Sequence, residues 1–133
     1  MYLNSPGGSL VGAMALGRLF RRNGFTTVVG ARSARDGSVA AGVCYSACPF
    51  AFAGGRPRAL EAGSVLGVHR AENRVPIPDE AEFQQRVTHD TKFYLAEMGI
   101  DERLVGIMSQ VPYDAIRVLS LEEAVTLKLV TVR

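Results

Sequence analysis

A glycine pair, a serine and a histidine lie along this 133-residue chain, and these residue types together could carry out acyl transfer. Ser46 lies among small and apolar residues, where a short strand is expected to give way to a helix. Free backbone N–H groups collect at such a point and can stabilise an oxyanion. A serine hydroxyl is a poor nucleophile unless a base takes its proton. His69, at the end of another expected strand, is the candidate base.

A glycine pair near the start of the chain completes the candidate site. Residues 5–8 read Ser-Pro-Gly-Gly, a turn in which proline fixes φ and the glycines permit backbone geometry closed to other residues. A side chain at Gly7 or Gly8 would also block the backbone from approaching a substrate. We therefore expect this turn, together with the N–H of Ala47, to form an oxyanion hole.

Each feature also has a purely structural interpretation. Ser46 fits a buried helix start built from small residues, and His69 fits a hydrogen-bonded histidine at a strand end. Residues 5–8 fit an ordinary strand-to-helix turn. The occurrence of all three in one chain favours the chemical interpretation. The other histidine, His89, lies in the middle of an expected helix and is interpreted as a surface residue.

The two cysteines, Cys44 and Cys48, flank Ser46. With only two histidines in the chain they are a weak metal signal, and no metal or cofactor is expected. A disulfide in an oxidising compartment is compatible with the sequence but cannot be deduced from it. Two buried free thiols are therefore the default expectation.

Length and composition favour one globular domain over residues 1–133 with a substantial core, because 47% of the residues are hydrophobic and charges of both signs are present. No apolar run approaches the roughly 18 residues that span a membrane, and no secretory signal is recognised.

The net charge of +2 conceals an uneven distribution of charge along the chain. Residues 1–74 carry nine arginines against three acidic residues, and residues 75–133 carry six basic against ten acidic residues. The arginines are scattered, so a solvated face or a subunit contact is favoured over nucleic-acid binding.

Hydrophobic periodicity and turn residues predict alternating strands and helices. Strands are expected at residues 2–4, 25–29, 39–43, 58–60, 64–69 and 129–132. Helices are expected at residues 10–22, from Ser46 to Gly54, at 79–98, at 101–111 and at 120–127. Residues 31–38 and 70–78 are expected to be loops. Such alternation predicts an α/β fold with crossover units on a mostly parallel sheet flanked by helices.

Four segments together resemble the proteolytic subunit of the Clp protease and its periplasmic-type relatives, within the ClpP/crotonase superfamily. They are Leu-Asn-Ser-Pro-Gly-Gly at 3–8, Cys-Tyr-Ser-Ala-Cys at 44–48, Gly-Val-His-Arg at 67–70 and the tail at 119–130. The resemblance implies a spiral of ββα units that lacks the first units. It also implies a serine peptidase with Ser46 as nucleophile and His69 as base, in which the glycine strip pairs with extended peptide substrate.

The acid of the expected triad is the weakest part of the resemblance. The family's acidic residue precedes the closing helix, and the matching position here is Pro112. Asp114, two residues further on, is the best substitute. Without an acid, His69 would be less well oriented, and a Ser–His dyad or a weak hydrolase would result.

The resemblance carries three further expectations. The family has strands and helices before the strand at 2–4, so the chain is interpreted as shortened at its start, with oligomerisation covering the surface left open. Residues 32–39 are interpreted as an insertion that lines the substrate groove or a subunit contact. The cysteines flanking the serine resemble the periplasmic-type relatives and favour the bacterial cell envelope over the cytoplasm.

The leading hypothesis is therefore a homo-oligomeric serine hydrolase acting on peptides, with an unfoldase or an envelope protein as a further partner. One alternative is a ClpP-like binding or assembly module without catalytic activity, which is suggested by Pro112 at the position of the family's acid. Another is a crotonase-type enzyme that binds acyl-CoA thioesters and has no need of Ser46 with His69.

Overall fold

The structure is a computed structural model that describes residues 1–72 and 76–133. Part of the loop predicted at 70–78 therefore lies outside the described residues. The strands are β1 (Tyr2–Leu3), β2 (Thr27–Val29), β3 (Ala31–Arg32), β4 (Val39–Ala40), β5 (Val43–Tyr45), β6 (Arg58–Leu60), β7 (Val65–Val68) and β8 (Arg117–Leu119). The helices are α1 (Leu10–Arg22), α2 (Cys48–Ala53), α3 (Glu80–Glu97), α4 (Arg103–Ser109) and α5 (Leu121–Thr126).

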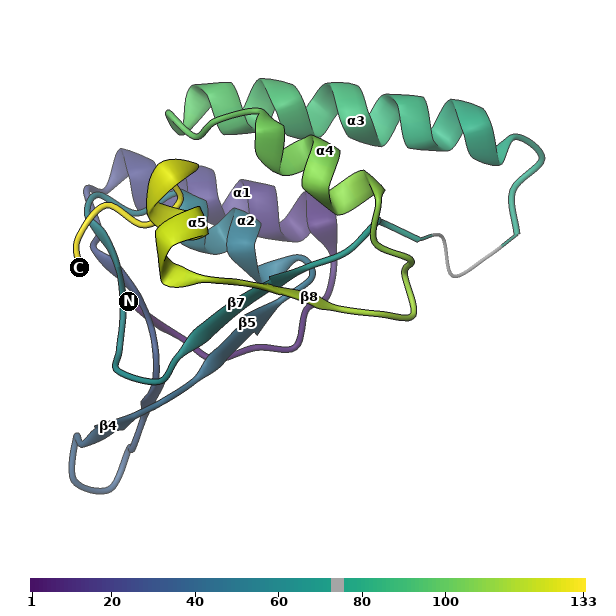
Figure 1. Cartoon of the computed structure of the whole chain (residues 1–133). Coiled ribbons are helices and arrows are strands. Elements are labelled where there is room, and N and C mark those ends of the chain that lie inside the picture. The colour runs from purple at the N-terminus through teal and green to yellow at the C-terminus, as the bar shows by residue number, and fades with distance from the viewer. Residues whose placement is uncertain (73–75) are drawn as a thin grey trace.

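Two three-stranded sheets form the base of the molecule, in the orders β1-β2-β6 and β5-β7-β8. A bridge between Ser5 and Cys44 joins them, so that β1 continues alongside β5. The β1–β2, β2–β6 and β5–β7 pairs are parallel, whereas β7–β8 is antiparallel. In Figure 1 the helices lie above these strands. The α/β class and the mostly parallel pairing predicted from the sequence are therefore observed.

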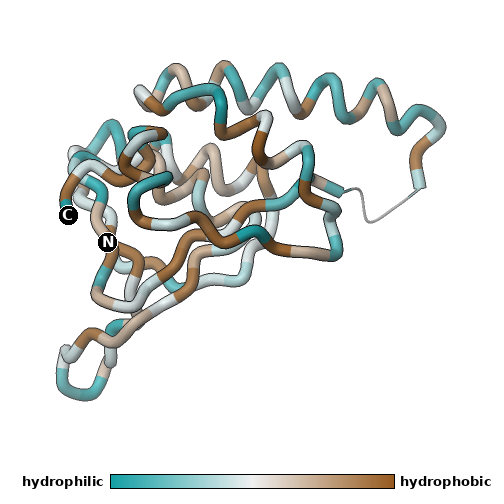
Figure 2. Tube along the Cα trace, viewed as in Figure 1, coloured by the Kyte–Doolittle hydropathy of each residue, from teal (hydrophilic) through white to brown (hydrophobic). Residues whose placement is uncertain are grey.

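The core lies between the strands and the helices. Its largest fully buried side chains include Tyr94, Phe50 and Leu66, which come from α3, α2 and β7. Figure 2 shows hydrophobic segments along the central strands, while the part of α3 that extends beyond the body of the molecule is mixed in hydropathy. At the contact of α1 with α2, a Cβ on Gly54 would lie only 1.9 Å from the carbonyl oxygen of Gly17. This segment therefore packs directly against α1.

Helix ends follow the capping residues in the sequence. Ser9 accepts a hydrogen bond from the N–H of Gly12 at the start of α1. Asp79 does the same for the N–H of Glu82 at the start of α3. Ser120 forms a capping box with Glu123 in the first turn of α5.

Three predicted elements differ from the structure. The segment at 31–38, expected to be a loop, contains β3, which pairs with β4 in a hairpin that projects from the body in Figure 1. The strand predicted at 39–43 is therefore divided between β4 and β5. β8 was not predicted, because it has only three residues and exposes Arg117 and Val118. The closing strand predicted at 129–132 is reduced to one bridge between Ala59 and Val132.

A buried arginine fastens the C-terminal segment to this fold. Arg58 is 4% exposed, and its guanidinium donates hydrogen bonds to the carbonyls of Leu129, Lys128, Ala53 and Gly55. Burial lowers its pKa to about 10. These four hydrogen bonds to carbonyl oxygens compensate for the loss of hydration of the buried guanidinium.

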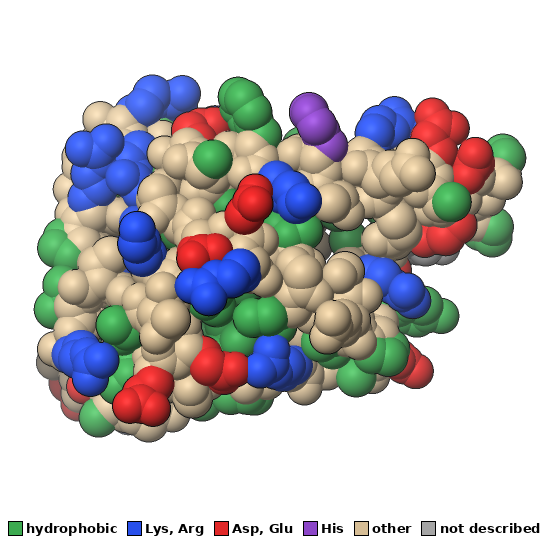
Figure 3. Space-filling view, turned by 45° about the horizontal axis from the view of Figure 1, so that its top comes forward, with side chains coloured by type: hydrophobic (Ala, Val, Ile, Leu, Met, Phe, Trp, Pro, Cys, Tyr) green, Lys and Arg blue, Asp and Glu red, His purple; other side chains and the backbone are tan. Residues whose placement is uncertain are grey.

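Charged side chains of both signs spread over the face shown in Figure 3, and a group of basic side chains lies at its left edge. This distribution agrees with the scattered arginines of the sequence. Within the described residues, none of the helices has the length and apolar character required to cross a bilayer.

Candidate active site

Ser46 follows the last residue of β5 and lies in the turn that leads into α2. Its φ is +63°, a left-handed backbone conformation that is uncommon for residues other than glycine. Its N–H donates to the carbonyl of Gly67 at 3.0 Å. In α/β-hydrolases the nucleophilic serine is presented on a strained strand-to-helix turn, which exposes its hydroxyl.

The pairing of β5 with β7 brings the histidine to the serine. Tyr45 lies opposite Gly67 in this parallel pair, so the residues after the two strand ends meet at the same edge of the sheet. His69 follows β7 directly, and its Nε2 lies 2.6 Å from Oγ of Ser46. The structure thus joins the two sequence-predicted residues by a hydrogen bond.

The other ring nitrogen of His69 contacts the backbone rather than a carboxylate. Nδ1 lies 2.7 Å from the carbonyl oxygen of Tyr113. Because a carbonyl oxygen only accepts hydrogen bonds, Nδ1 must carry a proton to donate. In a neutral imidazole, Nε2 is then free to accept the hydroxyl proton of Ser46. This contact therefore selects the tautomer that a general base requires.

A tight turn before β8 presents this carbonyl. The N–H of Ala115 donates to the carbonyl of Pro112 at 3.1 Å, and the N–H of Arg70 donates to the carbonyl of Val111 at 2.9 Å. The second bond joins the turn to the residue next to His69. Asp114, the acid expected from the sequence, is exposed on this turn. Across the described parts of the chain, no hydrogen bond or ion pair joins Asp114 to His69.

The glycine turn lies against the serine. A Cβ on Gly7 would come within 2.8 Å of Cβ and 3.3 Å of Oγ of Ser46, and the φ of Gly7 is +133°. Glycine is therefore required here by both space and backbone conformation. The N–H of Gly7 donates to the hydroxyl of Ser5 at 3.2 Å. Within the described segments, the N–H groups of Gly8 and Ala47 have no hydrogen-bond partner.

A cleft of about 800 Å³ opens beside Ser46 and His69. Both glycines and Ala47 line it, and so does the carboxylate-bearing Glu72. Its apolar lining comes from Leu10, Phe50, Met108 and Ile116. The cleft therefore combines apolar side chains with the backbone N–H groups that an extended acyl or peptidyl group would use.

The cysteines are not free. Cys44 and Cys48 form a disulfide, which corrects the default expectation of two thiols. Both side chains are buried, as predicted, and their Cα atoms lie 5.1 Å apart, well within the range that a disulfide bridges. The sequence left this open because a spacing of four residues allows either state.

One functional group was missed by the sequence. The carbonyl of Tyr113 has no side-chain signature, because every residue type carries a backbone carbonyl. The only available signal was Pro112, which indicates a turn close to the position expected for an acid.

No family profile matches this chain, and no curated protein matches it by sequence. Among solved structures, the chain is similar to a mutant of the 1510-N membrane-bound stomatin-specific protease, with a TM-score of 0.63 and 16% sequence identity. The similarity covers 97% of this chain and 60% of that one. At this identity the comparison establishes the fold alone: the chain has an α/β fold that a protease also adopts.

Proposed function

We propose that this protein is a serine hydrolase that cleaves peptide bonds through an acyl-enzyme at Ser46. The observation that carries the proposal is the hydrogen-bonded series from Ser46 Oγ to His69 Nε2 and from His69 Nδ1 to the carbonyl of Tyr113, at 2.6 Å and 2.7 Å. The cleft beside them distinguishes this pair from a serine and a histidine that meet only to pack.

In the acylation step, Oγ of Ser46 attacks the carbonyl carbon of the scissile bond while Nε2 of His69 takes the hydroxyl proton. The imidazolium that forms is stabilised by its Nδ1–H bond to the Tyr113 carbonyl, whose dipole is directed at it. His69 then donates the proton to the leaving amine, and the C–N bond breaks. A water molecule, activated by the same nitrogen, hydrolyses the ester at Ser46.

The N–H groups of Gly8 and Ala47 are the donors proposed for the oxyanion, because both line the cleft. Gly7 takes a supporting part. Its own N–H is directed to Ser5, and its missing side chain leaves room for the Ser46 side chain. This assignment refines the expectation that Gly7 and Gly8 act together with Ala47.

The peptidase is proposed to be of the ClpP type. The fold shared with a protease supports this, and so do the sequence segments that resemble the Clp family. The spiral of ββα units that this type implies, with the first units lacking, is part of the same proposal. A peptide substrate agrees with an open cleft whose backbone donors lie beside apolar side chains.

The cell envelope is the proposed location, because structural disulfides persist in oxidising compartments and are rare in reducing ones. A homo-oligomer and an unfoldase or envelope partner stay predictions from the resemblance.

A second candidate function has one observation in its favour. The residue expected to complete the triad does not reach His69, and a fold that has lost its acid could serve as a binding or assembly module. The bond to the Tyr113 carbonyl favours the hydrolase, because it holds the histidine in the tautomer required for a base.

A fluorophosphonate probe separates the two functions. We expect it to label Ser46, as mapped by peptide mass spectrometry, and we expect His69→Ala to lower the labelling rate by about a thousandfold. Ser46→Ala is the negative control, since it lacks the hydroxyl that the probe would modify. His89→Ala is the matched histidine control, since His89 is exposed on α3 and bonds only weakly to its neighbour Asp90 at 3.4 Å. A folded wild-type protein that takes no label would favour the binding module.

A further inference from the structure

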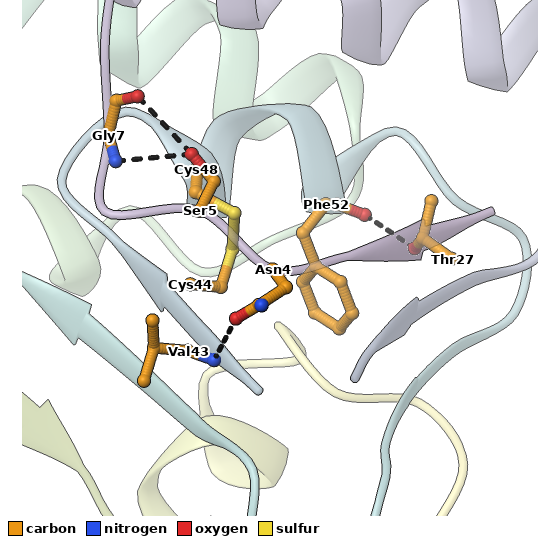
Figure 4. Close-up of a disulfide and its surroundings, with 8 residues drawn as sticks. All are labelled: Asn4, Ser5, Gly7, Thr27, Val43, Cys44, Cys48 and Phe52. Atoms are coloured by element: carbon orange, nitrogen blue, oxygen red, sulfur yellow. Dashed lines mark hydrogen bonds between the residues drawn. A yellow bond between two sulfur atoms is a disulfide. The ribbon is translucent and has the colours of Figure 1, made fainter. Parts of the chain in front are cut away.

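The disulfide spans the turn that carries the nucleophile. Cys44 is the middle residue of β5, Cys48 is the first residue of α2, and Ser46 lies midway between them. Figure 4 shows the bond linking the strand to the helix, beside the segment that bears Ser5 and Gly7. Within the described residues, this disulfide is the one covalent link across the turn apart from the backbone.

Hydrogen bonds fix the chain on the strand side of Ser46. The N–H of Val43 donates to Oδ1 of Asn4, the N–H of Ser5 donates to the carbonyl of Val43, and the N–H of Tyr45 donates to the carbonyl of Ser5. The first of these bonds is drawn in Figure 4. The backbone up to the serine is thus held by neighbours on the sheet.

The helix side of the turn is held differently. The N–H of Ala47 has no partner in the described parts of the chain, and no side chain caps α2. Cys48 is tied back to the strand by the disulfide. A serine in the left-handed region is intrinsically unfavourable, so it persists only where the surroundings enforce it. The bond from the Ser46 N–H to the carbonyl of Gly67 holds the serine to β7, and the disulfide is the restraint that links the two sides of the turn.

The fold as a whole depends less on this bond. The loop that it closes is short, and short loops gain the least stability from closure. In addition, α2 packs on α1 through Gly17 and Gly54. Loss of the disulfide is therefore expected to loosen the serine turn without unfolding the chain.

We propose that Cys44 and Cys48 are positioning residues for Ser46, and that reduction of their disulfide by a dithiol slows acylation while the fold is retained. This inference rests on the proposed function. In the redox step the dithiol supplies two electrons and two protons, the S–S bond breaks into two cysteine thiols, and the dithiol closes to its own disulfide. Ser46 then samples backbone conformations in which its Oγ is no longer hydrogen-bonded to Nε2 of His69.

The test measures fluorophosphonate labelling of the oxidised protein, the dithiothreitol-reduced protein and the Cys44→Ala/Cys48→Ala variant. Thiols are counted after denaturation, and circular dichroism confirms the fold. We expect the maximal labelling rate, kinact, to fall about tenfold on reduction and in the variant, while the probe's KI is unchanged. A merely structural effect would change both constants together with the melting temperature. The variant itself should not respond to dithiothreitol, which excludes an effect of the reductant elsewhere.

Equal kinact values in the oxidised and reduced wild-type protein would overturn the positioning role and leave the proposed hydrolase standing. Absence of labelling in the oxidised protein would overturn both. The thiol count shows whether dithiothreitol has reduced this buried bond; where it has not, a kinact of the double-alanine variant equal to that of the wild type overturns the positioning role.

Discussion

The Nδ1 atom of His69 lies 2.7 Å from the backbone carbonyl oxygen of Tyr113, the residue directly before the acid expected from the sequence. A carboxylate at this position would orient the imidazole and stabilise its charged form. A carbonyl orients it equally but offers only a dipole, so the stabilisation of the imidazolium is weaker. The site is therefore built for the correct tautomer, with less electrostatic assistance than a complete triad has.

The first prediction concerns Asp114. Because its carboxylate does not contact His69, Asp114→Asn should leave the fluorophosphonate labelling rate of Ser46 unchanged. In an enzyme whose triad aspartate is replaced by asparagine, kcat drops about ten-thousandfold. A large loss in Asp114→Asn would show that the carboxylate reaches His69 in solution, and that the turn moves to allow it.

The second prediction tests whether the turn that presents the Tyr113 carbonyl orients His69. Ala115→Pro removes the N–H that donates to the carbonyl of Pro112 and disfavours the turn conformation of Asp114. We expect the labelling rate to fall about tenfold as His69 loses its orientation. Tyr113→Ala keeps the carbonyl and exchanges only a half-exposed ring, and it is the matched control. Equal rates in both variants would argue against a role for the turn.

The third prediction concerns Gly7. In Gly7→Ala the new Cβ would meet Ser46 at 2.8 Å, and its backbone would be strained at a φ of +133°. We expect a loss of about 2 kcal/mol in the free energy of unfolding and of about a hundredfold in labelling rate.

Gly24→Ala is the control for backbone strain alone. Its φ is +66°, and no atom lies within 4 Å of the added Cβ. It should lower the free energy of unfolding by about 1 kcal/mol, as measured by urea denaturation, without affecting labelling. If Gly7→Ala behaved as Gly24→Ala does, Gly7 would have no part in the site.

The fourth prediction concerns Arg58. Arg58→Met retains apolar bulk but leaves three of the four carbonyls without a side-chain donor, since only that of Ala53 still accepts from Arg21, so we expect the free energy of unfolding to drop by about 3 kcal/mol in urea. Arg103→Met removes an exposed arginine that is paired with Asp101, and it should leave the urea midpoint unchanged. A stable Arg58→Met protein would mean that the C-terminal segment is held mainly by its apolar contacts.

Local sequence rules predicted the parts of the site that depend on regular structure. Ser46 and His69 each follow an apolar strand, and parallel strands bring their C-terminal ends to the same edge. The turn at 5–8 was recognisable because proline and glycine restrict or release φ in known ways. The helix predicted at residues 10–22 matches α1, which Ser9 caps.

The parts that were missed depend on long-range contacts. A backbone carbonyl has no residue-type signal, so Tyr113 could be found only once α4 and β8 were in place. The disulfide depends on the distance between Cys44 and Cys48 across a turn whose shape the spacing did not determine. β8 forms because β7 offers it an edge, and its own three residues show no clear alternation.

The fifth prediction concerns acid stability at α5. A hydrogen bond from the backbone N–H of Ser120 holds the pKa of Glu123 below its ordinary value of 4.5, and the charge of Arg117 acts in the same direction. The folded state thus binds fewer protons than the unfolded state as the pH falls below 4.5. The stabilisation is complete above that pH and is lost as the pH falls through the lowered pKa. Glu123→Gln keeps an acceptor for Ser120 but cannot ionise. By differential scanning calorimetry, we expect the wild type to have a higher melting temperature than the variant at pH 7, and this difference to shrink at pH 3. A difference that stays constant between the two pH values would show that the carboxylate charge contributes nothing to the capping box.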